Sequence, residues 1–298
     1  MSQTSTAAPA SQPRIADRRH VGGRSWDLII DSPAVGNQVP VRILLPAQYE
    51  QRPQQRWPVL VLLHGCCDSY ISWTRSTDIE KLAAKLEALV VMPDGGQVGF
   101  YANWLDGPQW EIFHTQELPQ LLAAEYRTSS RAAIAGVSMG GLGALGYAAR
   151  HPGQYVAAAS FSGIVHTRLS PDVSHGYLSL VSSYNANPLG LWGDPAKQAD
   201  VWKRHNPHDL AARLRSTALF LSAGDGQPGP LDLEGAVSDS IEASIGQQNR
   251  AIARRLDQLH IPARIDLYGD GTHNWVYWQR ELHRAWPMIT AALMQKPG

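Results

Sequence analysis

The sequence predicts a single α/β domain built on a mostly parallel, doubly wound sheet. Short runs of β-branched and other apolar residues alternate with helical stretches along most of the 298 residues, and this alternation favours parallel strands joined by crossover helices. Several later runs are almost continuously apolar, which is typical of strands buried on both faces. There is no internal repeat or heptad pattern that would indicate a different architecture.

The expected elements follow in order along the chain. Strands are predicted at residues 26–30, 41–45, 59–63, 88–92, 132–137, 155–160, 218–222 and 264–267. Helices are predicted at 79–86, 111–126, 140–149, 241–259 and 277–294. The helix at 241–259 repeats apolar residues at Ile241, Ile245, Ile252 and Leu256, which is helical spacing.

The domain is expected to span residues 24–298, with a loop-rich insertion at 165–213. This segment follows the sixth expected strand and is rich in Ser, Asn, Pro and Gly, and long insertions often cover an active site. Residues 1–23 are expected to form a disordered leader. The leader has no apolar signal-peptide core, which favours a cytoplasmic location. A secreted chain whose signal has been removed would look the same, so the compartment stays open.

Composition and charge argue against several function classes. The chain has 26 basic and 26 acidic side chains and a pI near 7.2, which argues against a nucleic-acid partner. Apolar runs such as 59–63 are far shorter than the ~20 residues that span a bilayer. There is no zinc-protease motif and no phosphate-binding glycine loop. We therefore expect no cofactor, metal or membrane span; the oligomeric state stays open.

The two cysteines, Cys66 and Cys67, are adjacent. A disulfide between neighbours requires an unusual peptide geometry, which favours free thiols over a vicinal disulfide. Their number does not decide the redox compartment.

A candidate nucleophile lies between an expected strand and an expected helix. Residues 136–141 read Gly-Val-Ser-Met-Gly-Gly, with Ser138 at the centre. A serine on a sharp strand-to-helix turn projects from the backbone, and flanking glycines avoid clashes in the turn. This context favours a nucleophilic serine over a serine in an ordinary glycine-rich turn.

A serine nucleophile of this kind needs a histidine that follows it in the sequence. His273 lies in a loop after the last expected strand, where a base can reach the carboxyl edge of the sheet. Position alone favours Asp225 as the acid, because it comes directly after a strand, the usual place for the acid in an α/β-hydrolase. Asp225 follows the strand at 218–222, whereas Glu242 begins the long helix. Asp225 could also be a turn residue, and Glu242 a carboxylate at a helix N-terminus.

From about residue 24 onward the chain resembles the antigen 85 mycolyltransferase and esterase D-like family of α/β-hydrolases. The matching segments are 62–65, 93–96, 100–104, 136–141, 184–187, 192–193, 202–207 and 271–278. The resemblance implies the α/β-hydrolase fold. In that family the acid is a glutamate seven residues before an asparagine, as Glu242 is before Asn249, so the resemblance favours Glu242 over Asp225.

The resemblance also implies an oxyanion hole formed by the backbone N–H groups of Cys66 and Met139. It further places His64, Trp104 and Trp275 near the substrate, although core packing is the alternative for the tryptophans. The family's sugar site uses an aspartate, an arginine and an asparagine, where this chain has His64, Cys67 and Ile71.

These observations predict a serine carboxylesterase that acts on a small-molecule acyl ester through an acyl-enzyme. Acyl transfer to a sugar hydroxyl, as in a mycolyltransferase, is the alternative within enzymes. A non-catalytic binding protein on the same fold is a third possibility, against which the complete Ser138, Glu242 and His273 set argues.

Overall fold

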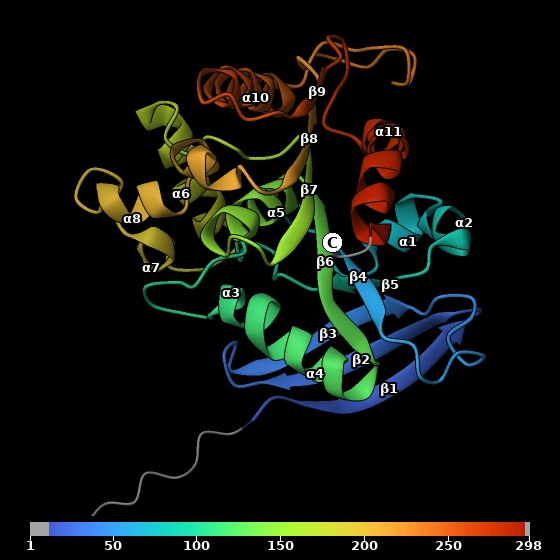
Figure 1. Ribbon diagram of the computed structural model, residues 1–298. Coiled ribbons are helices and arrows are strands. Elements are labelled where there is room, and N and C mark those ends of the chain that lie inside the picture. The colour runs from blue at the N-terminus through green and yellow to red at the C-terminus, as the bar shows by residue number, and fades with distance from the viewer. Residues whose placement is uncertain (1–11, 296–298) are drawn as a thin grey trace, which may run out of the picture.

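The computed structural model describes residues 12–295 and is built around a nine-stranded sheet (Figure 1). The strand order is β1-β2-β3-β5-β4-β6-β7-β8-β9. Strands β1 to β3 pair antiparallel and β3 pairs antiparallel with β5, while β5, β4 and β6 to β9 are parallel. The bounds are β1 (Arg14–Gly22), β2 (Ser25–Ser32), β3 (Asn37–Leu44), β4 (Trp57–Leu63), β5 (Leu89–Pro93), β6 (Thr128–Val137), β7 (Tyr155–Phe161), β8 (Ala218–Ala223) and β9 (Arg264–Leu267). The prediction of a mostly parallel sheet is confirmed.

Helices cover both faces of the sheet (Figure 1). One face packs against α4, α5 and α10, and the other against α1, α2 and α11. The helices outside the segment 165–213 are α1 (Ser72–Ser76), α2 (Ile79–Leu82), η1 (Ala83–Lys85), α3 (Trp110–Ile112), η2 (Phe113–Glu117), α4 (Leu118–Glu125), α5 (Met139–Arg150), α10 (Ser240–Gln258) and α11 (Trp275–Met294).

The central strands bury side chains on both faces. In β4, Leu60 and Leu62 pack in the core under α11, while Val59 and Leu63 pack in the core under α5. This alternation follows from the two-residue period of a strand. It explains why the run at 59–63 is continuously apolar, as predicted.

The prediction of a disordered leader is wrong for residues 14–22, which form the edge strand β1. Most of its side chains are exposed, and it is held by antiparallel pairing with β2. A strand whose backbone is paired while its side chains stay in solvent leaves no apolar pattern, and charged side chains are common on such edges. Residues 1–11 of the expected leader lie outside the described part of the chain.

The segment 165–213 is mainly helical, which corrects the prediction of a loop-rich insertion. It contains α6 (Pro171–Ser183), α7 (Pro188–Trp192), α8 (Ala199–Arg204), α9 (Pro207–Leu210) and η3 (Ala211–Leu214). The Ser170 and Asn187 side chains accept hydrogen bonds from the first turns of α6 and α7, and each is followed by proline. Ser-Pro and Asn-Pro are helix-start signals. The composition that suggested loops therefore marks helix N-termini.

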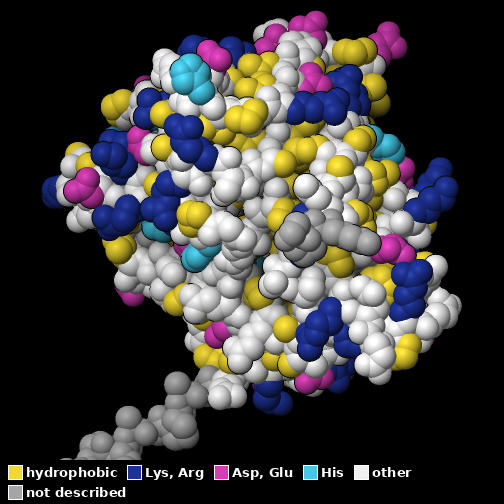
Figure 2. All heavy atoms as spheres, in the orientation of Figure 1, with side chains coloured by type: hydrophobic (Ala, Val, Ile, Leu, Met, Phe, Trp, Pro, Cys, Tyr) yellow, Lys and Arg dark blue, Asp and Glu magenta, His cyan; other side chains and the backbone are white. Residues whose placement is uncertain are grey.

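Charged side chains of both signs are interspersed over the face shown in Figure 2. Among residues 12–295 there is no helix long and apolar enough to cross a bilayer. In the same residues, no group of three histidine, cysteine or acidic side chains is placed to hold a metal ion.

Acid is expected to destabilise the fold through its buried histidines. His114 lies between the Tyr147 hydroxyl and the Asp94 carbonyl, at 3.0 and 2.8 Å, and burial lowers its pKa to about 4. The unfolded chain takes up this proton near pH 6.5, so the free energy of unfolding should fall as pH drops from about 6.5 to about 4. We expect the free energy of unfolding of His114→Gln, measured by chemical denaturation across this pH range, to decline less steeply than that of the unmodified protein. The exposed His175→Gln is the matched control, and equal slopes in all three proteins would contradict the assignment.

Candidate active site

Ser138 occupies the sharp turn between β6 and α5, as predicted. Its backbone has φ 54° and ψ −117°, a conformation that few non-glycine residues adopt and that is associated with functional sites. A Cβ on Gly136 would lie 2.2 Å from the Gly140 carbonyl oxygen, and one on Gly140 would lie 2.3 Å from the Leu63 carbonyl oxygen. Glycine is therefore required at Gly136 for β6 to pack against the start of α5, and at Gly140 for α5 to pack against the end of β4.

His273 and Glu242 form a hydrogen-bonded pair, although 31 residues separate them. The His273 Nδ1 donates to Glu242 Oε2 at 2.6 Å. The Glu242 carboxylate is fully buried, and its Oε1 also accepts from the Ser162 hydroxyl at 2.8 Å and from the Gly224 N–H at 2.6 Å. This arrangement fixes the imidazole and leaves Nε2 free to accept a proton.

Asp225, the alternative acid, does not contact His273. Its Oδ1 accepts from the Gln227 N–H at 2.9 Å, and its own N–H donates to the Gly269 carbonyl. Asp225 is therefore a turn residue after β8. The structure brings Glu242, rather than Asp225, to the histidine.

The two expected oxyanion donors lie on neighbouring segments. A Cβ on Gly65 would lie 3.4 Å from the Ser138 Cβ, so the loop after β4 contacts the serine turn. Met139 is the first residue of α5, where an N–H group has no intrahelical partner. Outside the regular helices and strands of residues 12–295, no backbone carbonyl accepts from the Cys66 or Met139 N–H.

Ser138 and His273 line the same cavity, which has a volume of about 1110 Å³. Its walls come from the loop after β4, from α6, from the start of α10 and from the start of α11. The apolar residues among them are Ile164, Val173, Tyr177, Leu180, Ile241, Ile245, Trp275 and Trp278. The volume and the apolar walls suit an acyl chain next to the serine.

Two of the three residues expected near substrate lie elsewhere. His64 is fully buried: its Nδ1 donates to the Gly65 carbonyl at 2.7 Å, and its Nε2 accepts from the Gly95 N–H at 2.9 Å. A ring whose Nε2 accepts a hydrogen bond is neutral, and burial lowers the pKa of His64. Trp104 packs in the core, with its indole N–H on the Gly99 carbonyl. The prediction is therefore wrong for both, whereas Trp275 does line the cavity.

The cysteines form a disulfide with each other, which corrects the prediction of free thiols. The backbone at Cys67 has an unusual conformation. Its φ of 67° places it in the left-handed region, a conformation uncommon in a residue other than glycine. The sequence carried no signal for that local conformation.

Comparison with known proteins identifies the family. The family model "Esterase" matches residues 32–289. The chain belongs to this esterase family. It is 32% identical over 262 residues to the esterase Rv1288 of Mycobacterium tuberculosis, covering 84% of this chain and 56% of that protein. It thus spans little more than half of that relative.

Two further relatives connect the esterase-family chain to the antigen 85 proteins, as the sequence resemblance predicted. The chain is 30% identical to the diacylglycerol acyltransferase/mycolyltransferase Ag85B of Mycobacterium leprae, covering 80% of this chain and 77% of that protein. The crystal structure of M. tuberculosis MPT51 (FbpC1) superposes with a TM-score of 0.76 at 24% identity, covering 91% of this chain and all of MPT51. This likeness confirms the α/β-hydrolase fold.

Two polar residues that hold the His273–Glu242 pair in this esterase-family site could not be recognised from the sequence. Ser162 follows β7 at a φ of 44° and donates to Glu242. Asp239 caps α10: its Oδ1 accepts from the Ile241 and Glu242 N–H groups, and its Oδ2 accepts from the His273 N–H at 2.9 Å. One carboxylate thus joins the helix of the acid to the loop of the histidine. The only sequence signal was an aspartate at a helix start, which also fits an ordinary cap.

Asp239→Ser is expected to lower kcat while leaving the fold stable. Serine can still cap α10, but its shorter side chain cannot also reach the His273 N–H. We expect kcat for ester hydrolysis to fall roughly tenfold with little change in KM, since a misplaced base impairs the chemical step. Asp239→Ala should add a loss of stability of about 1 kcal/mol. Equal kcat in Asp239→Ser and the unmodified protein would show that Asp239 acts only as a cap.

Proposed function

We propose that this chain is a serine carboxylesterase that forms an acyl-enzyme on Ser138. The observation that carries the proposal is the hydrogen-bonded His273–Glu242 pair, which shares a cavity with a serine on a strained strand-to-helix turn. This set matches the nucleophile, base and orienting acid of serine hydrolases.

In the proposed mechanism, His273 Nε2 takes the proton from the Ser138 hydroxyl as Oγ attacks the acyl carbonyl carbon. The N–H groups of Cys66 and Met139 stabilise the negative oxygen of the tetrahedral intermediate. The intermediate collapses when His273 returns the proton to the leaving alcohol. Water, deprotonated by His273, then attacks the acyl-enzyme and releases the acid and Ser138. Glu242 stabilises the His273 imidazolium both while the acyl-enzyme forms and while it is hydrolysed.

Water is the preferred acceptor in this proposal, because the positions that match the antigen 85 sugar site carry no group that is free to bind a sugar. Cys67 lies in a disulfide, and His64 points into the core. Asp68 lines the cavity, but its carboxylate is occupied by Arg75 at 2.6 and 3.0 Å. A site that lacks those hydrogen bonds to sugar hydroxyls favours a sugar over water less strongly, since each hydrogen bond is worth roughly 0.5–1.5 kcal/mol.

Product partitioning tests hydrolysis against transfer. The protein is incubated with p-nitrophenyl esters of graded acyl length and rising trehalose, and free acid and acyl-trehalose are quantified. We expect free acid to predominate at millimolar trehalose for every ester that is turned over. Predominant acyl-trehalose would show a transferase, and the absence of p-nitrophenyl butyrate turnover would favour a binding protein.

A further inference from the structure

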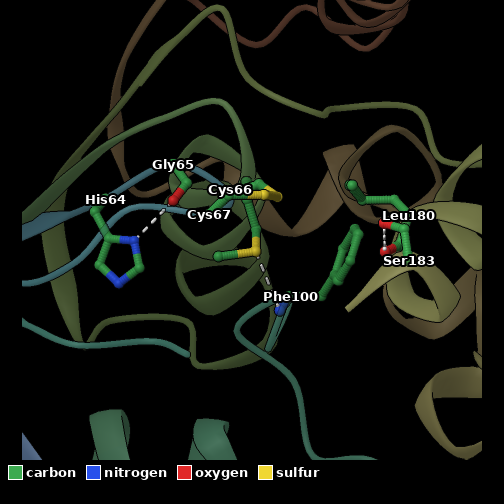
Figure 3. The surroundings of a disulfide bond; sticks show 8 residues. His64, Gly65, Cys66, Cys67, Phe100, Leu180 and Ser183 are labelled. Atoms are coloured by element: carbon green, nitrogen blue, oxygen red, sulfur yellow. Dashed lines mark hydrogen bonds between the residues drawn. A yellow bond between two sulfur atoms is a disulfide. The ribbon is translucent and has the colours of Figure 1, made fainter. Parts of the chain in front are cut away.

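The Cys66–Cys67 disulfide lies at the wall of the catalytic cavity. Both residues line the cavity together with Ser138 and His273. Cys66 is half-buried and Cys67 is exposed. Figure 3 shows the disulfide on the loop after His64 and Gly65, on the side that faces Leu180 and the Phe100 ring. A small thiol in solution can therefore reach it through the cavity.

The peptide unit that carries the Cys66 N–H is fixed on one side by His64. The Gly65 carbonyl and the Cys66 N–H belong to the same trans peptide, so they point in opposite directions. The buried His64 ring donates to that carbonyl at 2.7 Å (Figure 3). The carbonyl is thereby held toward the protein interior, and the N–H points away from it.

On the other side, the same peptide unit is joined to the disulfide. The S–S bond closes a small ring that contains the Cys66–Cys67 peptide, and the Cα of Cys66 belongs both to this ring and to the peptide unit with the donor N–H. The ring constrains Cys67, which has a φ of 67°. In that conformation the Cys67 N–H donates to the Gln97 carbonyl at 2.8 Å.

Opening the ring removes this constraint. The left-handed region is unfavourable for a residue other than glycine, so a reduced Cys67 is expected to leave it. Rotation about the Cys67 N–Cα bond then turns the Cys66–Cys67 peptide. This moves the Cys67 N–H away from the Gln97 carbonyl and shifts Cys66. Beyond Cys67 the chain is held again, by the ion pair between Asp68 and Arg75. The freed motion is therefore concentrated at Cys66 and Cys67.

We propose that the vicinal disulfide is a redox-sensitive positioning element for the oxyanion donor on Cys66. The oxidised form holds the N–H in place for catalysis, and the dithiol form lowers kcat. This inference rests on the proposed function, because it needs an oxyanion to stabilise. The oxyanion donor is a backbone N–H and does not itself need a cysteine side chain. The proposal gives the two cysteine side chains a function of their own.

The chemistry is thiol–disulfide exchange with an external dithiol such as dithiothreitol. One dithiothreitol thiolate attacks a cysteine sulfur, the S–S bond between Cys66 and Cys67 breaks, and a mixed disulfide with dithiothreitol forms. The second dithiothreitol thiol displaces the remaining cysteine thiolate and closes the cyclic disulfide of oxidised dithiothreitol. Two electrons and two protons pass to the cysteines, and oxidised dithiothreitol or glutathione disulfide reverses the reaction.

The test compares steady-state kinetics of the unmodified protein in its two redox states. Alkylation and intact-mass measurement verify that no thiol is free before reduction and that two are free afterwards. We expect reduction to lower kcat for a p-nitrophenyl ester about tenfold or more, with a smaller change in KM and full recovery on reoxidation; complete loss of one oxyanion donor costs about 10²–10³-fold. The variant C66S/C67S should show the low kcat of the reduced protein and no response to dithiothreitol.

The outcomes separate the two proposals. Equal kcat in the verified disulfide and dithiol states would overturn the positioning role and leave the esterase assignment intact. Two free thiols without any reductant would also overturn it. No ester turnover in either state, together with no Ser138 adduct from a fluorophosphonate, would instead overturn the proposed function. An equal loss of kcat on adding dithiothreitol to C66S/C67S, which contains no cysteine, would also overturn the positioning role.

Discussion

Ser138→Ala is expected to lower kcat for ester hydrolysis by about 10⁴-fold or more, because triad members act as a unit and no other nucleophile occupies the turn. His273→Ala should cause a similar loss, since the base is then absent. The fold should persist in Ser138→Ala because the hydroxyl makes no cap hydrogen bond to α5. Thermal unfolding measured beside the kinetics checks this.

The double variant Ser138→Ala/His273→Ala sharpens the result. If the two residues act in one mechanism, the double variant should be no slower than Ser138→Ala alone. Multiplicative losses would show that they act independently, and retention of most activity in Ser138→Ala would contradict the nucleophile assignment.

Glu242→Gln is expected to cost on the order of 10³–10⁴-fold in kcat, by analogy with amide replacement of the acid in other serine-enzyme triads. Three donors converge on the buried carboxylate, from His273, Ser162 and Gly224. A glutamine side chain has one acceptor oxygen and an amide group that cannot accept, so the histidine loses its working tautomer or another donor loses its partner.

Asp225→Asn is the matched control, because it makes the same acid-to-amide change in the residue after Gly224, whose N–H donates to Glu242. Asp225 contacts only its own turn through its side chain, so kcat should stay within a few-fold of the unmodified protein. If Asp225→Asn lost most of its kcat while Glu242→Gln kept it, the acid would be Asp225 rather than Glu242.

The sequence predicts the sheet and the positions of Ser138 and His273 because these depend on topology. The carboxyl ends of parallel strands meet at one edge of the sheet, so a serine after one strand and a histidine after another come together. For the acid, position alone favours Asp225, the residue that follows β8 more closely, but the structure brings Glu242 to the histidine. Only the family resemblance favoured Glu242, and its hydrogen bond to His273 agrees with that choice.

The errors have physical causes. Position in a motif does not give side-chain direction, and for this reason His64 and Trp104 were placed near substrate although both point into the protein. Asp239 was missed because its bond to the His273 N–H spans 34 residues, whereas its local role is an ordinary cap. Strand β1 was missed because it is held by backbone pairing and leaves most of its side chains in solvent.

The most direct test of the esterase assignment is the site of covalent labelling by a fluorophosphonate. Such a probe reacts with an activated nucleophile, which here requires Ser138 together with His273 and Glu242. The protein is labelled, digested and mapped by mass spectrometry, with Ser138→Ala as the control. We expect a single adduct on Ser138 that is absent from the variant. An adduct on another residue, or no adduct on the active protein, would contradict the account.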